Sequence, residues 1–241
     1  MCTIIIVSRI LEETPLLLAA NRDEDLSRPA APPALLDDRN PKVVAPRDLQ
    51  AGGTWLGINA HGLLAAITNR FDGPRDATRR SRGELVFEAL EHATPGAAAE
   101  AIAAHDAGDY NGFHLTLSSV EDVRVVWSDG ATMKQVTYGP GVHVFTERSF
   151  RDEVTPRVAF LRERVEALRA AGELDVPHLQ DLLSIHRPGD VDATCVRIPE
   201  MNYGTRSSTI VDPARPLLLH AEGAPCEVAY EDRSALLHAL L

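Results

Sequence analysis

The spacing of hydrophobic positions changes along the chain from a strand-like period to a helix-like period and back. Apolar, β-branched runs predict strands, and turns rich in Gly, Pro and Asp separate several of them. A short turn near residues 12–15 predicts an N-terminal hairpin, and the turns within 112–145 predict an antiparallel meander. The expected strands are 2–7, 16–20, 63–68, 113–117, 123–127, 142–145, 194–198, 207–211, 217–220 and 227–230.

Helices are expected between these groups of strands. Ser81 and Glu84 have capping-box spacing ahead of an apolar run, so one helix should begin there. Gly172 should stop a long helix whose apolar positions recur every three or four residues. This long helix is expected over 154–171. The remaining expected helices cover 95 to about 105, 179–185 and the end of the chain.

This order of elements predicts an α+β fold, in which a pair of antiparallel sheets is covered by helices on the outside. No shift in composition marks a boundary, so a single domain is expected over residues 1–241. Residues 28–50 interrupt the pattern with five prolines. We expect them to form an irregular, semi-rigid loop at the lip of a site.

Composition and charge narrow the classes of function. Lys and Arg number 24 against 35 Asp and Glu, and the net charge of −11 argues against a nucleic-acid binder or a basic membrane-surface protein. No apolar run approaches the roughly 18 residues of a membrane span, and the N-terminus lacks the features of a secretory signal. The three cysteines are far apart, and the nine histidines show no metal-ligand spacing. We therefore expect a cytoplasmic protein without a disulfide framework, metal or cofactor.

Cys2 is the sharpest candidate for chemistry. Removal of the initiator Met, which is usual before a small residue, would leave a thiol and a free α-amino group on Cys2. Because an α-amino group has a pKa of about 7.7–8.0, it can serve as the base for the nucleophilic thiol. The alternative is that Cys2 is a small apolar residue at the start of a buried strand.

Arg22 and Asp23 follow the second strand of the expected hairpin, which should return them close to Cys2. A carboxylate there would orient the α-amine, and a guanidinium would favour the thiolate. A charged turn at the end of a strand is the simpler alternative.

Four more places hold site candidates, each with a plainer structural alternative. The glycines around Trp55 allow the backbone to approach a ligand closely, or form a tight turn beside a core Trp. Asn69 ends a strand, where its amide can donate to an oxyanion or belong to an ordinary turn. Five arginines between residues 70 and 82 can hold an anionic group or form a solvated loop. Arg206 lies in a polar run between apolar strands, as a buried ion-pair partner or a site residue.

Several segments taken in chain order carry a joint signal that covers nearly the whole sequence. They are Met1-Cys2-Thr3, Asn21-Arg22-Asp23-Glu24, Gly52-Gly53-Thr54-Trp55-Leu56-Gly57, Ile67-Thr68-Asn69, Arg82-Gly83-Glu84, Tyr110-Asn111-Gly112-Phe113 and Tyr203-Gly204-Thr205-Arg206-Ser207-Ser208-Thr209. Together they resemble the NRDE family, which is that of transport and Golgi organisation protein 2. That family is similar to the N-terminal nucleophile hydrolases, with their four-layer αββα sandwich, and within them to choloylglycine hydrolases and acid ceramidase-like amidases.

The resemblance implies a hydrolase site in which Cys2 supplies the nucleophile and its own amine the base. The residues implied to act with it are Arg22, Asp23, Asn69 as an oxyanion donor and Arg206 as a support for the thiolate. The residues expected to bind the substrate are Trp55, Arg82 and Asn111.

One segment departs from the family pattern. Members usually carry a Ser-Asn motif and then a Pro-Trp pair before the long helix, but here Glu147 stands near the place of the Asn. In the bile-salt-hydrolase pattern that Asn serves the oxyanion hole, and a carboxylate would repel the oxyanion. Either the segment is shifted, or the amidase chemistry of this member is altered or lost.

We expect hydrolysis of a C–N bond in a linear amide or acyl conjugate, through an acyl-enzyme on Cys2. The expected partner is a small molecule, anionic and partly apolar, and neither a nucleic acid nor a membrane. The alternative is a binding protein on the same fold, since the resemblance also implies haem trafficking and lipid or acyl-CoA homeostasis. A third reading is an interaction module.

Overall fold

The computed structural model describes residues 2–71, 75–151, 154–187 and 189–240, and the chain divides into two compact units. The first unit combines residues 1–28 with 141–233, and the second combines 29–140 with 234–241. Within the described residues each unit holds one seven-stranded sheet, and the strands of both sheets pair antiparallel. The expected α+β class is confirmed.

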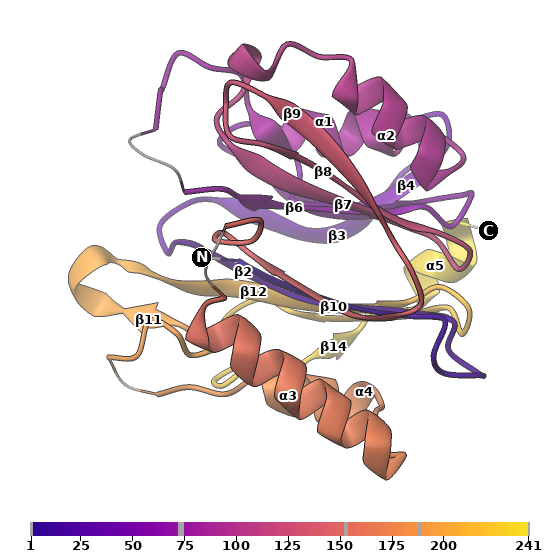
Figure 1. Ribbon diagram of the computed structural model, residues 1–241, viewed down its shortest axis with the longest axis vertical. Coiled ribbons are helices and arrows are strands. Elements are labelled where there is room, and N and C mark those ends of the chain that lie inside the picture. Colours follow the sequence, from indigo (N-terminus) through magenta and orange to yellow (C-terminus); the bar gives the residue numbers. More distant parts are fainter. Residues whose placement is uncertain (1, 72–74, 152–153, 188, 241) are drawn as a thin grey trace. The chain divides into compact units, whose positions relative to one another are not determined.

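The first sheet is built around the N-terminal hairpin. Its strand order is β10-β1-β2-β12-β13-β14, and β11 also pairs with β12. The hairpin itself is confirmed, because β1 and β2 pair antiparallel with Thr3 opposite Asn21. The strands are β1 Thr3–Ser8, β2 Leu16–Asp25, β10 Gly141–Thr146, β11 Arg197–Ile198, β12 Tyr203–Asp212, β13 Leu217–Ala221 and β14 Glu231–Asp232. Segments from both halves of the chain thus lie side by side around β2 (Figure 1).

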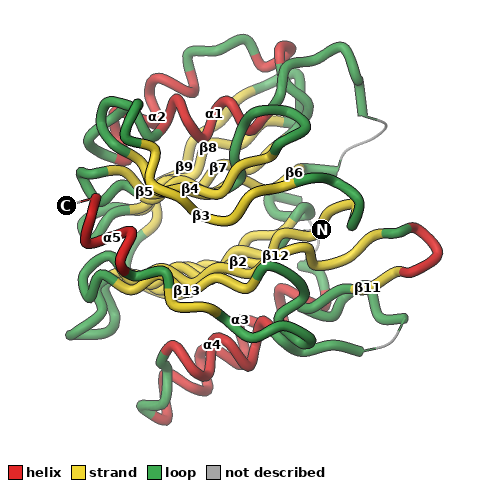
Figure 2. Tube along the Cα trace, turned by 180° about the vertical axis from the view of Figure 1, so that it is seen from behind, coloured by secondary structure: helices red, strands yellow, loops and turns green. Residues whose placement is uncertain are grey.

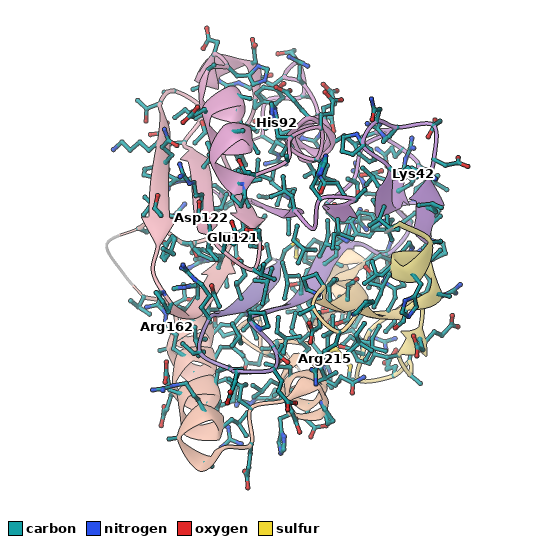
Figure 3. The ribbon with its side chains drawn as sticks, turned by 90° about the vertical axis from the view of Figure 1, so that its right-hand side faces the viewer. Lys42, His92, Glu121, Asp122, Arg162 and Arg215 are labelled. Atoms are coloured by element: carbon teal, nitrogen blue, oxygen red, sulfur yellow. A yellow bond between two sulfur atoms is a disulfide. The ribbon has the colours of Figure 1, made fainter. Side chains whose placement is uncertain are left out.

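Helices α3 (Pro156–Ala171) and α4 (Val176–Leu183) cover one face of this sheet (Figure 2). Thr155 caps α3 by accepting a hydrogen bond from the backbone N–H of Val158, and Gly172 ends the helix in the left-handed conformation at φ 72°. The apolar face of α3 packs with β1, β2 and α4 into a buried cluster. Arg162 lies on the exposed side of the same helix (Figure 3).

The second sheet has the strand order β3-β4-β5-β6-β7-β8-β9. Its core is formed with α1 (Arg82–Ala89) and α2 (Pro95–Ala103), which begin as expected after Ser81 and Thr94. Helix α5 (Ala235–Leu240) packs against β3 and β4. The strands are β3 Ala30–Leu36, β4 Val43–Asp48, β5 Leu56–Asn59, β6 Leu64–Asn69, β7 Phe113–Ser118, β8 Val123–Ser128 and β9 Met133–Tyr138. Short 3₁₀ turns cover Ala107–Asp109 and Pro199–Met201.

The proline-rich stretch is not an irregular loop, which corrects the expectation for residues 28–50. It forms β3 and β4, and β3 is an edge strand whose pairing shifts between Ala31 and Ala34, where Pro32 and Pro33 lie. An edge strand with such a bulge tolerates residues that lack a backbone N–H. In β4, Pro46 lies beyond Val43 and Val44, the two residues paired to β5.

Two further strand expectations were wrong. Residues 142–145 do not close the meander, because β10 leaves it and pairs with β1, and β9 takes the last place beside β8. Residues 227–230 form no strand; the next strand is the two-residue β14. In the described part of the chain, no helix is long and apolar enough to cross a membrane.

Candidate functional site

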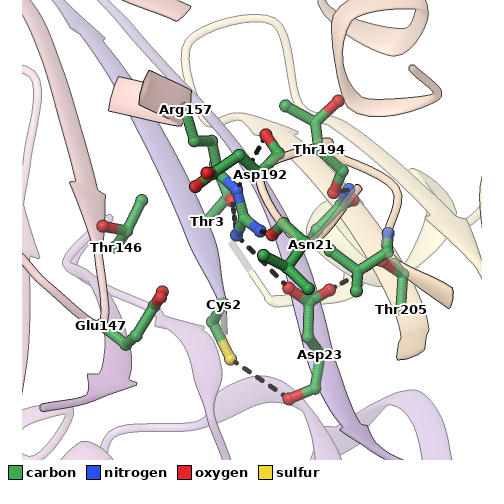
Figure 4. A network of polar contacts seen from close by, with 12 residues as sticks. Cys2, Thr3, Asn21, Asp23, Thr146, Glu147, Arg157, Asp192, Thr194 and Thr205 are labelled. Atoms are coloured by element: carbon green, nitrogen blue, oxygen red, sulfur yellow. Dashed lines mark hydrogen bonds and ion pairs between the residues drawn. The ribbon is translucent and has the colours of Figure 1, made fainter. Parts of the chain in front are cut away.

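Cys2 directly precedes β1, and strand pairing brings it beside Asp23 on β2. With Thr3 opposite Asn21, the next step of the antiparallel register carries Cys2 toward Arg22 and Asp23. The Cys2 thiol donates a weak hydrogen bond to the backbone carbonyl of Asp23, with Sγ 3.7 Å from the oxygen (Figure 4). The expected juxtaposition of these residues is therefore present in the first unit.

Asp23 is a buried carboxylate held from two sides. Its Oδ1 accepts a hydrogen bond of 2.7 Å from the Thr205 hydroxyl, and its Oδ2 lies 3.7 Å from Nη1 of Arg157. Burial raises the pKa of Asp23 to about 6, although the positive charge of Arg157 and the bond from Thr205 act in the opposite direction. The carboxylate is thus poised to change charge near neutral pH.

Arg157 was missed by the sequence analysis. Its side chain is 2% exposed, and it contacts the Thr3 hydroxyl, Asp23 and the backbone carbonyls of Val191 and Asp192. The sequence does contain a pattern that could have indicated Arg157. Residue 157 lies four positions before Leu161, so it falls on the apolar face of the long helix. A charged residue on that face indicates a buried partner.

Asn21 of the Asn21-Arg22-Asp23-Glu24 motif links β2 by hydrogen bonds to the end of α4 and to the segment before β11. Its amide donates to the carbonyls of Leu183 and Thr194, at 2.9 and 2.8 Å. Arg22 is 5% exposed and lies 3.7 Å from the carboxylate of Glu24. The first three residues of the motif are therefore all buried.

Burial raises the pKa of the Cys2 thiol, and the charge of Arg22 acts against this rise. The hydroxyl of Tyr203 donates to the carbonyl of Asp23 at 3.0 Å, on the same carbonyl that accepts from Cys2. Arg206 lies at the bulge where β12 shifts its register against β2, and it pairs with Glu222 at 3.2 Å. Its expected support for the thiolate stays a prediction.

Glu147 follows β10 directly, and the register places it across from Cys2. Thr3 is opposite Thr146, so one further step aligns Cys2 with Glu147. Figure 4 draws Asp23 and Glu147 on opposite sides of Cys2. The negative charge of Glu147 also contributes to the raised pKa of Asp23. A carboxylate therefore lies across from Cys2 in the first unit, and its correspondence to the family's Asn stays a prediction.

Three of the other expected residues meet in the second unit. Asn69, Arg82 and Asn111 line one cavity of about 460 Å³, whose wall also includes Phe71 and several arginines. Arg82 donates to the carbonyl of Gly112 at 2.9 Å, and Asn111 exchanges two hydrogen bonds with the backbone of Asp76. Their action on a substrate stays a prediction.

Trp55 packs against the apolar core of the second unit. The glycines beside it have a structural explanation, because a Cβ built on Gly53 would lie 2.7 Å from the backbone of Gly83 at the start of α1. Close approach of two backbone segments requires glycine there, and binding of a substrate by Trp55 stays a prediction.

Cys195 and Cys226 form a disulfide, which departs from the expectation of a chain without a disulfide framework. They are 31 residues apart in the sequence, but the segment before β11 and the segment after β13 converge, so that their Cα atoms lie 6.6 Å apart. Sequence spacing alone gave no sign of this pairing. Cys2 is the free cysteine.

Comparison with known proteins identifies the family. The sequence model of transport and Golgi organisation 2 matches residues 1–215. The chain belongs to this family. Transport and Golgi organization protein 2 homologs from Bos taurus and Homo sapiens are 28% and 27% identical to it, over 92% of this chain and 87% of their own. An uncharacterized protein of Saccharomyces cerevisiae is 38% identical over 36% of this chain and 30% of its own.

This transport and Golgi organisation 2 member also matches solved structures of hydrolases. A Caenorhabditis elegans ortholog of N-acylethanolamine-hydrolyzing acid amidase superposes with a TM-score of 0.64 at 15% identity, over 88% of this chain and 93% of that one. The C2A mutant of the conjugated bile acid hydrolase from Clostridium perfringens gives 0.60 at 13%, over 98% and 93%. At such identities the likeness concerns the fold, and the expected N-terminal nucleophile hydrolase-like fold is confirmed.

Proposed function

We propose that this protein is an N-terminal cysteine hydrolase that cleaves a non-peptide C–N bond in an amide or acyl conjugate. The observation that carries the proposal is the arrangement at the start of β1, where Cys2 contacts Asp23 and Asp23 is held by Thr205 and Arg157. The two solved hydrolases with this fold, one of them studied as its C2A mutant, support the same reading.

The proposed chemistry needs the removal of Met1. The free α-amine of Cys2 then takes the thiol proton, and the thiolate attacks the amide carbonyl carbon. The resulting oxyanion collapses, the C–N bond breaks, and the α-ammonium returns the proton to the departing amine. Water then hydrolyses the thioester, with the same amine as base. The buried carboxylate of Asp23 orients the amine, and Arg157 and Thr205 hold that carboxylate in place.

Processing is also what would activate the thiol. In the chain that begins with Met1, burial raises the pKa of the Cys2 thiol, so that the neutral thiol prevails at neutral pH. A free α-amino group on Cys2 would supply both a base and, once protonated, a positive charge next to the sulfur.

The test compares three proteins whose N-termini have been sequenced: the processed chain, a chain that retains Met1, and the processed Cys2→Ala variant. N-acylethanolamines and bile-acid conjugates are the substrate panel, because the solved hydrolases act on these classes. We expect turnover only in the processed wild type, with an acyl adduct on Cys2 seen by mass spectrometry. Turnover in the folded Cys2→Ala variant would overturn the proposal.

A second candidate function is non-catalytic binding of an anionic, partly apolar ligand such as haem or an acyl-CoA. The observation that favours it is the cavity of the second unit, which combines arginines with Phe71, a side chain that is 64% exposed. Haem or acyl-CoA that binds with equal affinity to the wild type and to Cys2→Ala, in a protein without turnover, would support binding over hydrolysis.

A further inference from the structure

Three side chains of the first unit that take no part in the proposed hydrolysis converge on one point. A ring nitrogen of His186 and the sulfurs of Cys195 and Cys226 lie within 4.8 Å of one another. Cys195 is buried, whereas His186 and Cys226 are exposed. The three come from different segments, since His186 follows α4, Cys195 precedes β11 and Cys226 lies between β13 and β14.

We propose that, when the disulfide is reduced, His186, Cys195 and Cys226 bind a thiophilic divalent cation of the zinc class. Two thiolates and one imidazole are a set that zinc takes in proteins, with bonds of about 2.3 Å to sulfur and about 2.0 Å to nitrogen. Because the donor atoms already lie within 4.8 Å of one another, the three side chains can converge on one cation once the disulfide is broken.

The hydrogen bonding of His186 supports a ligand role. Its Nδ1 donates a hydrogen bond of 3.0 Å to the carbonyl oxygen of Cys195. Because Nδ1 carries the proton in that bond, Nε2 keeps its lone pair for a metal. Metal-bound histidines usually donate their other ring N–H to a carbonyl or a carboxylate in this manner.

Space for the remaining coordination position lies beside Cys226. This residue lines a cavity of about 230 Å³ together with Gly223, Arg206 and Glu227. A water molecule, or a small anion drawn by Arg206, can complete a tetrahedral set from that side.

The disulfide and the metal site are alternative states of the same two sulfurs. A dithiol reductant breaks the S–S bond by delivering two electrons and two protons, and it becomes a disulfide itself. Binding of the cation then releases the two thiol protons as the thiolates coordinate it. Oxidation by a disulfide or peroxide reverses the exchange, takes two electrons from the sulfurs and expels the cation.

The site adjoins the residues that hold Asp23. Thr194, next to Cys195, accepts a hydrogen bond from Asn21, and Val196, on the other side, donates to the Thr205 hydroxyl that binds Asp23. Either the metal or the disulfide would fix the segment that supports this network.

The test titrates Co²⁺ into the full-length reduced protein in a buffer with a phosphine reductant, under argon. We expect about one Co²⁺ per chain, with a sulfur-to-cobalt charge-transfer band and the visible bands of tetrahedral coordination. Cys226→Ser should lose most of the charge-transfer intensity, and His186→Ala should weaken uptake and shift the visible bands. Cys2→Ser, which removes the remaining thiol, is the matched control and should bind as the wild type does.

No uptake by the reduced wild type would overturn the proposal, as would uptake that survives in Cys226→Ser or disappears in Cys2→Ser. Because Cys226 is exposed, its substitution is not expected to prevent folding. A second measurement does not depend on spectra: Zn²⁺ should raise the melting temperature of the reduced wild type and of Cys2→Ser, but not that of Cys226→Ser. Equal shifts in all three proteins would also refute the site.

Discussion

Glu147 adds a negative charge on the side of Cys2 opposite Asp23. Its side chain is 14% exposed, and its Oε2 is buried without a hydrogen bond to any residue that the structure describes. It pairs loosely with Arg148, at 3.8 Å. Two carboxylates, Asp23 and Glu147, therefore flank a single thiol, an arrangement that opposes any further negative charge between them.

We predict that Glu147→Asn increases the reactivity of Cys2. Removal of one negative charge should stabilise the thiolate by about 1 kcal/mol and speed alkylation at fixed pH about threefold to tenfold. The measurement is the rate of iodoacetamide modification of Cys2 against pH, read by mass spectrometry on the processed chain.

Glu147→Gln is the matched control, because it removes the charge and keeps the length of the side chain. Similar gains in both variants would assign the effect to charge. A gain in the Asn variant alone would assign it to geometry, and unchanged rates in both would contradict the prediction.

Some residues of the site could be predicted from the sequence, and others could not. Cys2, Arg22 and Asp23 could be placed together because the turn of a hairpin fixes the register of its two adjacent strands. Arg157 and Thr205 contact Asp23 although they follow it by 134 and 182 residues in the sequence. The hydroxyl of Thr205 donates a hydrogen bond of 2.7 Å to Asp23. Such long-range partners follow from tertiary packing, which local periodicity does not encode.

At the scale of elements, the segment before β5 and the start of α1 are in close backbone contact in the second unit. A Cβ at Gly53 would lie 2.7 Å from the carbonyl carbon of Gly83, and one at Gly83 would lie 2.9 Å from the carbonyl oxygen of Thr54. Since backbone atoms cannot rotate away as a flexible side chain can, both positions exclude a side chain.

We predict that Gly53→Ala destabilises the protein by about 1–3 kcal/mol, because the added methyl group forces two backbone segments apart. Gly139→Ala is the control: a Cβ there meets no described atom within 4 Å, so its effect should stay within about 0.5 kcal/mol. Urea denaturation followed by circular dichroism measures both. Equal stability of the two variants would show that α1 moves to accommodate the methyl group.

Helices and strands were predicted best where the hydrophobic periodicity agreed with the cap and turn residues at their ends. The start of α2 after Thr94 and the end of α3 before Gly172 agree with the expected bounds, because cap residues are local signals. The strands β3 and β4 were missed because proline normally argues against a strand, and only the edge position and the bulge reverse that argument. The departure of β10 to another sheet is likewise a property of topology, not of the residues 142–145 themselves.

At the scale of the whole molecule, each compact unit is assembled from two separated segments of the chain. In the first unit, β2 from the N-terminal part pairs along most of its length with β12 from the C-terminal part. Asp23 lies within this pairing, opposite Thr205, so its protonation is coupled to the folding of segments about 180 residues apart.

We therefore predict a pH dependence of unfolding that is due to Asp23. Its pKa is about 6 in the folded protein against 3.8 for the free group, so between these values the folded state binds more protons than the unfolded state. Stability attributable to this carboxyl consequently falls as the pH rises from about 4 to about 6 and is level above that range. The shift of about two units corresponds to about 3 kcal/mol.

The measurement is the free energy of unfolding of the wild type minus that of Asp23→Asn, at several pH values. Groups that titrate identically in both proteins cancel in this difference. The ion pair with Arg157 forms as Asp23 ionises, so its contribution is already contained in the pKa of Asp23 and is not a separate offset. We expect the difference to decrease with pH between about 4 and 6. An increase over the same interval would mean that the attraction of Arg157 outweighs burial, and that Asp23 is a permanent anion at the site rather than a group that titrates beside Cys2.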